Sequence, residues 1–270
     1  MSDNVHAVSA TVAARLPRAL VVDPNSGGAK ILAELLRSIV PNCQVMLVQS
    51  EQRAFELMES FNPQLIFVEY KGATLDGLEF TRALRHSYLP CRAAPVIVVT
   101  AEATAAAIMG ARDAGVHEFL RRPYTFGDLK KRIDAVVIRP RDWIEGVNYV
   151  GPDRRRFNSA DYKGPRKRRA EGASPVAQRI AQAIKIVQAA AAASHQQPQQ
   201  AMRALQAQCR ILAGVSVGRP AFAHLRTSAA ALEAYLVGPA RADGLSRQQI
   251  ENFAAQLLAA APEEKPTQAA

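Results

Sequence analysis

One aromatic residue, a Gly-Pro pair and a basic run occur together twice in this chain, thirteen residues apart. The first copy, residues 149–156, is called the first arm, and the second copy, residues 162–169, is called the second arm. The planar guanidinium group of arginine pairs with phosphate or with the edge of guanine, and its flat face stacks on a base. The repeat therefore predicts two similar arms that grip one anionic ligand.

Positive charge is concentrated around the arms. The chain has a formal net charge of +10, and residues 139–169 contain ten Lys or Arg against four acids, a net +6. Such a segment predicts an anionic partner, although a solvated basic linker and a nucleic-acid or membrane-binding patch are open alternatives. No helix-turn-helix, zinc-finger or RNA-binding sheet motif accompanies the basic run, which disfavours nucleic acid.

The composition excludes several other classes of protein. The 270 residues are 49% hydrophobic, but no run approaches the roughly 18 apolar residues of a membrane span, so we expect a cytoplasmic protein without a signal peptide. Cys43, Cys91 and Cys209 lack CxxC spacing, which indicates neither a disulfide framework nor a zinc site. Since no Ser-His-Asp set, metal cluster or Walker loop is found, we predict no enzyme activity, no metal and no cofactor.

Residues 18–138 alternate short β-branched runs with segments of helical period. This pattern predicts an α/β fold with a doubly wound, five-stranded parallel sheet covered on both faces. The expected strands are 19–22, 44–48, 65–68, 96–99 and 118–120, and the expected helices lie near 27–39, 51–61, 77–88, 103–114 and 126–138.

The remainder of the chain has a different character. The Gly-, Pro- and Arg-rich stretch from about 140 to 173 has too few apolar residues for a core and is expected to be flexible before it binds a ligand. Further helices are expected near 174–193, 198–213, 220–237 and 246–260, the last with Ser246 and Gln249 at capping-box spacing. The predicted organisation is a flexible N-terminus (1–16), an α/β domain (17–138), an arginine-rich duplicated segment (139–173), an all-α region (174–261) and a disordered tail (262–270).

Four polar residues directly follow expected strands: Asp23 the first, Glu69 the third, Thr100 the fourth and Arg122 the fifth. With an Asp-Gly pair at 76–77, this order resembles the receiver domain of two-component response regulators, the CheY-like fold. In that family, acids after strand 1 hold Mg²⁺, an Asp after strand 3 accepts a phosphoryl group, and a Thr or Ser and a Lys before Pro follow strands 4 and 5. The resemblance implies a role in two-component signal transduction.

Three of these positions depart from the family pattern. Pro24 replaces the second acid, Glu69 replaces the phosphoacceptor Asp, and Arg122 replaces the Lys. Mg²⁺ demands near-ideal octahedral oxygen coordination, so a lost ligand and a nucleophile displaced by one methylene should disable phosphoryl transfer. We therefore predict a degenerate pocket, a pseudo-receiver without Mg²⁺ that does not use the usual phosphorelay.

Two consequences of the substitution at Glu69 are open. The longer carboxylate could engage Thr100 and imitate a phosphorylated state. Alternatively, Glu69 could form a fixed ion pair with Arg122, which would make the domain a static scaffold.

A CheY-like domain with an arginine-rich extension also resembles the Cle-type effectors of alphaproteobacteria, which bind cyclic di-GMP and act on the flagellar motor. Cyclic di-GMP has two phosphates and two guanines related by symmetry, which suits two similar arms. In each arm the Gly-Pro turn would bring the backbone close, and the basic residues would reach a guanine edge or stack on the base. The predicted contact residues are Tyr149, Gly151, Pro152, Arg154, Arg155 and Arg156 in the first arm and Tyr162, Gly164, Pro165, Arg166, Arg168 and Arg169 in the second.

The sequence thus predicts a noncatalytic signalling protein that binds cyclic di-GMP and regulates a protein partner, such as the flagellar motor or a histidine kinase. The rival prediction is a response regulator within a phosphorelay, whose basic segment serves as a nucleic-acid or membrane-binding linker.

Overall fold

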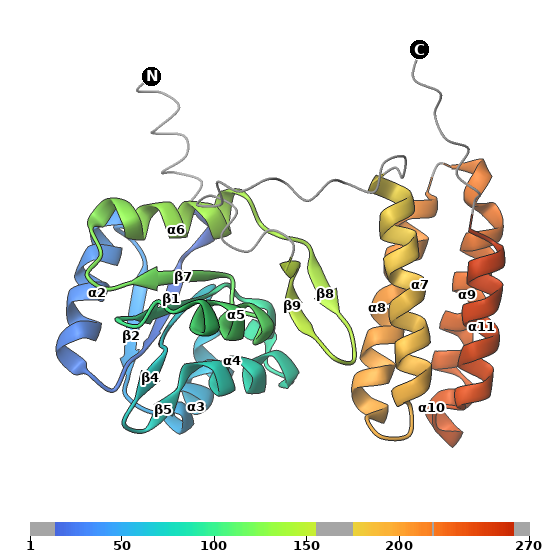
Figure 1. Cartoon of the computed structure of the whole chain (residues 1–270), viewed down its shortest axis with the longest axis horizontal. Coiled ribbons are helices and arrows are strands. Elements are labelled where there is room, and N and C mark those ends of the chain that lie inside the picture. Colours follow the sequence, from blue (N-terminus) through green and yellow to red (C-terminus); the bar gives the residue numbers. More distant parts are fainter. Residues whose placement is uncertain (1–13, 155–174, 218, 262–270) are drawn as a thin grey trace, which may run out of the picture. The chain divides into compact units, whose positions relative to one another are not determined.

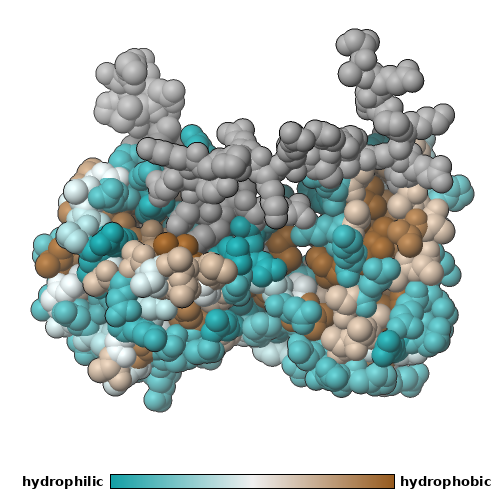
Figure 2. Space-filling view, in the orientation of Figure 1, coloured by the Kyte–Doolittle hydropathy of each residue, from teal (hydrophilic) through white to brown (hydrophobic). Residues whose placement is uncertain are grey.

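The computed structural model describes residues 14–154, 175–217 and 219–261. The described residues form two units. The first unit contains residues 14–144 and 149–154 and holds the α/β sheet, and the second contains residues 145–148 and the C-terminal helices (Figure 1). Hydrophobic side chains are interspersed among hydrophilic ones on the visible surface of each unit (Figure 2).

Five parallel strands form the sheet of the first unit, in the order β2-β1-β3-β6-β7. This is the doubly wound order of the CheY-like fold, so the predicted fold class is confirmed. The strands are β1 (Arg18–Val22), β2 (Gln44–Val48), β3 (Leu65–Glu69), β6 (Val96–Thr100) and β7 (Glu118–Arg121).

Helices cover both faces of this sheet, as predicted. Side chains of α2 (Ser26–Ile39) and α6 (Phe126–Ile138) share one hydrophobic cluster with alternate strand residues such as Val21 and Phe67. The other cluster contains Leu20 and the helices of the opposite face. Those helices are α3 (Glu51–Phe61), α4 (Gly77–His86) and α5 (Ala105–Asp113). The alternation follows from the two-residue period of a strand, which sends successive side chains to opposite faces.

Side-chain caps fix where the helices begin. The Asn25 side chain accepts hydrogen bonds from the first backbone N–H groups of α2, and Asp76 does the same for α4. Thr125 and Asp128 form a reciprocal capping box at the start of α6. Each cap satisfies backbone donors that have no partner within the helix.

Short elements complete the first unit. A two-stranded pair, β4 (Lys71–Gly72) and β5 (Leu75–Asp76), follows β3, and the 3-10 helix η1 (Pro90–Ala93) precedes β6. After α6, β8 (Trp143–Glu145) and β9 (Val150–Pro152) form a second two-stranded sheet. Residues 143–152, which belong to the stretch expected to be flexible before it binds a ligand, thus include two strands in this structure.

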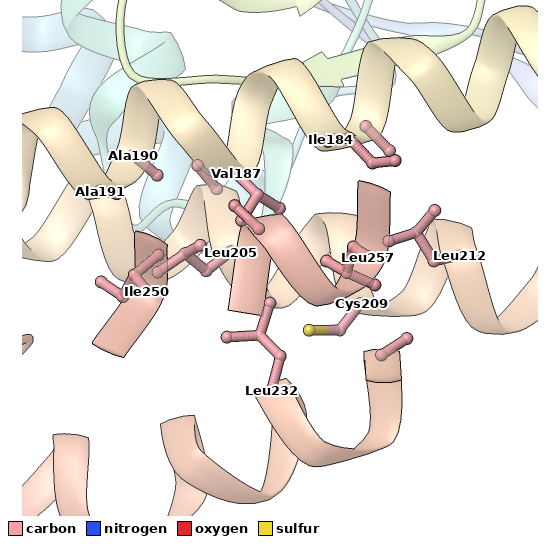
Figure 3. Packing of buried hydrophobic residues seen from close by; sticks show 14 of the residues in the cluster. Ile184, Val187, Ala190, Ala191, Leu205, Cys209, Leu212, Leu232, Ile250 and Leu257 are labelled. Carbon is pink, nitrogen blue, oxygen red and sulfur yellow. The ribbon is translucent and has the colours of Figure 1, made fainter. Parts of the chain in front are cut away.

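The second unit is built from four longer helices around one apolar core. These are α7 (Pro175–Ala193), α8 (Pro198–Ser216), α9 (Ala223–Val237) and α11 (Arg247–Ala259), joined by the short η3 (Pro220–Phe222) and α10 (Pro239–Asp243). Alanines of α7 and α8 let the helices approach closely, while larger residues such as Leu205, Leu232 and Leu257 fill the centre (Figure 3). The predicted all-α region is confirmed, and the short α10 was not predicted.

Among the described residues, no helix is long and apolar enough to cross a membrane.

Candidate functional site

The carboxyl end of the parallel sheet brings together the four residues predicted for the receiver pocket. Asp23 follows β1, Glu69 and Thr100 end β3 and β6, and Arg122 follows β7. Neighbouring parallel strands present the same end at the same edge of a sheet, so residues far apart in the sequence meet there. Asp23 and Thr100 are buried, and Glu69 and Arg122 are half-buried.

Arg122 bridges the two carboxylates of this pocket. Its Nη2 lies 2.8 Å from Oδ2 of Asp23, and its Nη1 forms a close ion pair with Oε2 of Glu69. The second oxygen of each carboxylate is also engaged: Oδ1 of Asp23 accepts from the Asn25 N–H, and Oε1 of Glu69 accepts from the Tyr70 N–H. The pocket is thus a closed network, and Glu69 forms an ion pair with Arg122, which is one of the two alternatives that the sequence left open.

The electrostatic environment favours the charged guanidinium. Burial acts to lower the pKa of Arg122, but the hydrogen bond that it donates to Glu69 and the negative charges of Glu69 and Asp23 outweigh this effect, so the pKa is raised. Burial also raises the pKa of the neighbouring Tyr124 phenol. Arg122 therefore acts as a permanent cation between two anions.

Thr100 does not share in this network through its hydroxyl. The Thr100 hydroxyl accepts from the Glu102 N–H at 3.0 Å, and the Thr100 carbonyl accepts from the Arg122 N–H at 2.6 Å. The backbone contact holds the β7 end beside β6. In this structure the Glu69 carboxylate therefore pairs with Arg122 and with the Tyr70 amide, as in the scaffold alternative.

Gly77 fixes the chain that leaves Glu69. A Cβ at this position would lie 2.2 Å from the Glu69 carbonyl oxygen, and the Gly77 N–H donates to the Tyr70 carbonyl at 2.9 Å. Only glycine fits such a close backbone approach, while Asp76 caps the helix that starts there. The Asp-Gly pair therefore positions Glu69.

These residues do not fit a bound Mg²⁺. The ion needs free oxygen ligands in octahedral geometry, whereas the carboxylates of Asp23 and Glu69 already pair with a guanidinium and Pro24 offers no side-chain oxygen. Within the described ranges, no group of three or more His, Cys, Asp or Glu could hold a metal ion.

The described part of the first arm is folded against the first unit. Tyr149 is buried, and its hydroxyl donates to the Pro152 carbonyl at 2.5 Å. The guanidinium of Arg154 lies 4.4 Å from the centre of the Tyr149 ring and forms an ion pair with Asp113 at 3.1 Å. Stacking and ion pairing together hold Arg154, although its side chain is 47% exposed.

Gly151 serves a packing role in this structure. A Cβ at Gly151 would lie 2.7 Å from the Cα of Gly115, and a Cβ at Gly115 would lie 2.6 Å from the Val150 carbonyl oxygen. The Gly-Pro turn was expected to bring the backbone close to a ligand. Here it brings the backbone close to the loop between α5 and β7.

A buried arginine that sequence reasoning missed lies beneath this turn. Arg85, 1% exposed, donates from Nε and Nη2 to the Gly115 carbonyl and from Nη1 to the carbonyls of Arg92 and Ala94. Its Nη2 also lies 3.2 Å from Nδ1 of His117. Burial, together with neighbouring positive charge, lowers the pKa of His117 well below its ordinary value, so the imidazole is neutral.

Two further residues join this cluster from the segment after α6. Arg141 donates to the carbonyls of Val116, His117 and Asp153, and the Trp143 ring lies 5.3 Å from the guanidinium carbon of Arg85. These contacts explain why 143–152 is ordered. No local sequence signal marks them, because each joins residues at least 12 positions apart and all but the contact with Asp153 join residues more than 20 apart.

The remaining predicted contact residues lie outside the described residues. They are Arg155, Arg156, Tyr162, Gly164, Pro165, Arg166, Arg168 and Arg169.

Comparison with known proteins supports the receiver assignment. Residues 19–134 match the family model of the response regulator receiver domain, so this segment is similar to a receiver domain. The chain is 32% identical to the transcriptional regulatory protein PdtaR of Mycobacterium tuberculosis over 91 residues, which cover 34% of this chain and 42% of the relative. It is 30% identical to the response regulator MprA of Mycolicibacterium vanbaalenii over 123 residues, covering 45% of this chain and 51% of that protein.

The matches thus span about half the length of these relatives, or less. Among solved structures, the chemotaxis response regulator CheY4 of Vibrio cholerae is 17% identical with a TM-score of 0.40, covering 45% of this chain and 98% of that chain. A response regulator from Thermotoga maritima is 22% identical with a TM-score of 0.40, covering 46% of this chain and 98% of that chain.

Proposed function

We propose that the receiver domain is a pseudo-receiver that transmits signals without catalysis and without accepting a phosphoryl group. The observation that carries this proposal is the bridge from Arg122 to both Asp23 and Glu69. In the receiver family the corresponding carboxylates hold Mg²⁺. Here a tethered guanidinium supplies positive charge at that place permanently, so the domain keeps one state.

Opening this pocket for a metal ion has a high energetic cost. Removing one partner of a fully buried ion pair typically costs about 3–5 kcal/mol, and for Arg122, which is 28% exposed, we expect a smaller cost of about 1–3 kcal/mol. A divalent ion would have to displace Arg122 from both carboxylates before it could bind. The pocket is therefore specialised for a fixed charge.

Treatment with acetyl phosphate and Mg²⁺, followed by intact-mass analysis, tests this proposal. We expect no phosphoryl adduct on the wild-type chain. The triple variant Pro24→Asp, Glu69→Asp, Arg122→Lys restores the family pattern and should accept the phosphoryl group, which shows that the assay detects it. A phosphorylated Asp23 or Glu69 in the wild type would reject the pseudo-receiver.

We further propose that the two arms bind cyclic di-GMP and that this second messenger is the input. The repeat of the arms and the net +6 of residues 139–169 support it, together with the resemblance to Cle-type effectors. In the first arm, Arg154 is stacked on Tyr149 and still about half exposed. A guanine could stack on the outer face of this guanidinium or pair with its edge.

The burial of Tyr149 assigns it a supporting role in this proposal. Because its ring is 9% exposed and lies under Arg154, it orients the guanidinium instead of stacking on a base itself. Such preorganisation lowers the entropy lost when the ligand binds. The other arginines of the arms then contact the second guanine and the phosphates.

Calorimetry on the full chain tests this second proposal, with GMP and duplex DNA as competing ligands at two salt concentrations. Substituting Arg155, Arg156, Arg168 and Arg169 with Gln should weaken cyclic di-GMP binding at least about tenfold, since each bidentate base contact is worth roughly 1–3 kcal/mol. A matched variant removes four charges elsewhere: Lys185, Arg226, Arg241 and Arg247. It should bind like the wild type.

The same titrations distinguish the rival function. Weak binding of all three ligands with a steep salt dependence would indicate a nonspecific polyanion linker within a response regulator. The output is proposed to be a contact between the receiver domain and a protein partner, such as the flagellar motor or a histidine kinase.

A further inference from the structure

An open cavity at one end of the helical unit is lined by three arginines. It has a volume of about 430 Å³ and lies between the start of α7 and the end of α8. Its lining residues are Val176, Arg179, Arg210, Ile211, Gly214, Val215 and Arg219. The lining thus combines three cations with three branched apolar side chains and contains no acid.

The three arginines carry no compensating charge within the part of the chain that the structure describes. No carboxylate there forms an ion pair with Arg179, Arg210 or Arg219, and all three side chains are exposed. Like charges gathered at one cavity repel one another, so an anion bound between them relieves that cost.

The helix ends reinforce this positive potential. Val176 lies in the first turn of α7, where the helix dipole is positive, and Arg179 lies at the start of the second turn. The opposite dipole at the end of α8 is offset by Arg219, whose Nη1 donates to the Val215 carbonyl at 2.6 Å. An anion in the cavity therefore meets donors from both helices.

Gly214 keeps the wall of the cavity open. It lies in the last turn of α8, it is not the C-cap residue, and a Cβ placed on it would meet no atom within 4 Å. Glycine costs a helix roughly 0.5–1 kcal/mol relative to alanine. Packing does not require glycine here, and Gly214 leaves this part of the cavity lining without a side chain.

We infer that this cavity binds the phosphate group of a small organic phosphate, with the arginine forks on the phosphate oxygens. Val176, Ile211 and Val215 would contact the apolar part of the ligand. The volume lies within the range of about 300–1,000 Å³ that is typical of small-molecule sites. This site is independent of the proposed arms, since it is formed by the folded helices.

Titration of inorganic pyrophosphate and of GMP into the full-length chain tests the site. The host protein carries Arg155, Arg156, Arg168 and Arg169 as Gln, so that the arms contribute no binding, and calorimetry measures the affinity. Substituting Arg179, Arg210 and Arg219 with Gln should weaken pyrophosphate binding at least about tenfold, because charged hydrogen bonds are lost. Inorganic phosphate is titrated as a third ligand, and GMP should bind the host more tightly than inorganic phosphate does, because the apolar wall adds contacts.

Two matched variants keep the inference falsifiable. Lys185, Arg226 and Arg241 as Gln remove the same charge from exposed positions of this unit and should leave binding within about twofold. Gly214→Leu fills the cavity with all arginines present and should also weaken binding, with circular dichroism confirming the fold. The inference is overturned if the host binds no pyrophosphate, if both triple variants weaken binding equally, or if Gly214→Leu binds normally.

The result of the cavity experiment can be distinguished from the result of the cyclic di-GMP experiment. That proposal fails if the arm substitutions leave cyclic di-GMP binding unchanged in the otherwise wild-type chain. The cavity is judged on pyrophosphate in a protein without functional arms.

Discussion

Two arginines of the first unit are shielded from solvent by different kinds of partner, and their pKa values are shifted in opposite directions. Arg122, at the carboxyl end of the sheet, pairs with the carboxylates of Asp23 and Glu69, and its pKa is raised. Arg85, near the amino ends of β6 and β7, is fully buried and donates to backbone carbonyls. Burial lowers the pKa of Arg85 to about 9.

The two environments indicate different roles: the charge of Arg122 matters for the pocket, whereas the hydrogen bonds of Arg85 matter for the stability of the fold. Two anions stabilise the charge of Arg122, which under the proposed function takes the place of a metal ion. Carbonyl dipoles only partly offset the burial of Arg85, whose guanidinium instead joins two segments, one at Gly115 and one at Arg92 and Ala94. Arginine therefore neutralises charge at the carboxyl end of the sheet, as Arg122, and joins backbone segments at the other end, as Arg85.

The largest expected effect is that of Arg85→Met. Methionine fills much of the volume but leaves the carbonyls of Gly115, Arg92 and Ala94 without these donors. We expect a loss of about 3–5 kcal/mol in the free energy of unfolding of the first unit. Urea titration followed by the fluorescence of Trp143, the single tryptophan, measures it because this ring lies against Arg85.

Arg82→Met on the same helix is the matched control. Arg82 pairs with Glu79 at the surface, with side-chain exposures of 42% and 66%, so its loss should cost less than about 1 kcal/mol. Equal costs for the two variants would contradict the architectural role of Arg85.

Arg122→Met should have a smaller effect on stability and a distinct effect on metal response. We expect a loss of about 1–3 kcal/mol, because Asp23 and Glu69 lose their shared cation in a partly solvated pocket. Mg²⁺ should then raise the melting temperature of the variant and leave that of the wild type unchanged, since only the variant has free carboxylates. Differential scanning fluorimetry with and without Mg²⁺ measures both effects.

Arg121→Met provides the comparison for this substitution, because Arg121 is the exposed neighbour on the same strand end. It should change the stability by less than about 0.5 kcal/mol and should not respond to Mg²⁺. Stabilisation of the wild type by Mg²⁺ would contradict the proposed replacement of an ion by Arg122.

The two arginines also differ in how far the sequence predicts them. Arg122 and the rest of its pocket could be found because strand ends of a parallel sheet converge, so sequence order translates directly into proximity. Arg85 lies in the last turn of α4, where a favourable interaction with the helix dipole is usually enough to explain a basic residue. Its burial depends on a loop thirty residues away, which no periodicity encodes.

The first arm shows the same limit. Its composition predicts flexibility, but Tyr149 and Gly151 fit the surface around Gly115, and this tertiary packing overrides the local signal. In the second unit, by contrast, the predicted helices agree closely with the structure because caps and apolar stripes are local features.

The stability of the first unit at acid pH also tests the role of Arg85, because Arg85 lies beside the buried His117. The depressed pKa of buried His117 means that, below the ordinary value of 6.5, the unfolded chain binds a proton that the folded chain does not. Its contribution to stability is therefore complete above about pH 6.5 and is lost as the pH falls, by up to about 1.4 kcal/mol per pH unit. Urea titrations from pH 7.5 to 5 measure this slope.

His117→Gln removes the titrating group and should flatten the slope relative to the wild type, although it lowers stability at neutral pH. His86→Gln, on α4, is a control that should retain the wild-type slope. An unchanged slope in His117→Gln would mean that other groups dominate the acid response.

The smallest expected effect concerns Arg154, whose guanidinium is neither buried like that of Arg85 nor enclosed by carboxylates like that of Arg122. Its ion pair with Asp113 is about half exposed and is worth roughly 0.2–1 kcal/mol. If the first arm binds cyclic di-GMP, Arg154 must give up some of this pairing, so Asp113→Asn should strengthen binding by about 1.5- to 5-fold. Calorimetry on the full chain measures the gain, and Glu79→Gln, which breaks a similar surface pair away from the arm, should show none. Weaker binding in Asp113→Asn would instead mean that the ion pair orients Arg154 for the ligand, so that the pair is part of the site rather than a competitor for it.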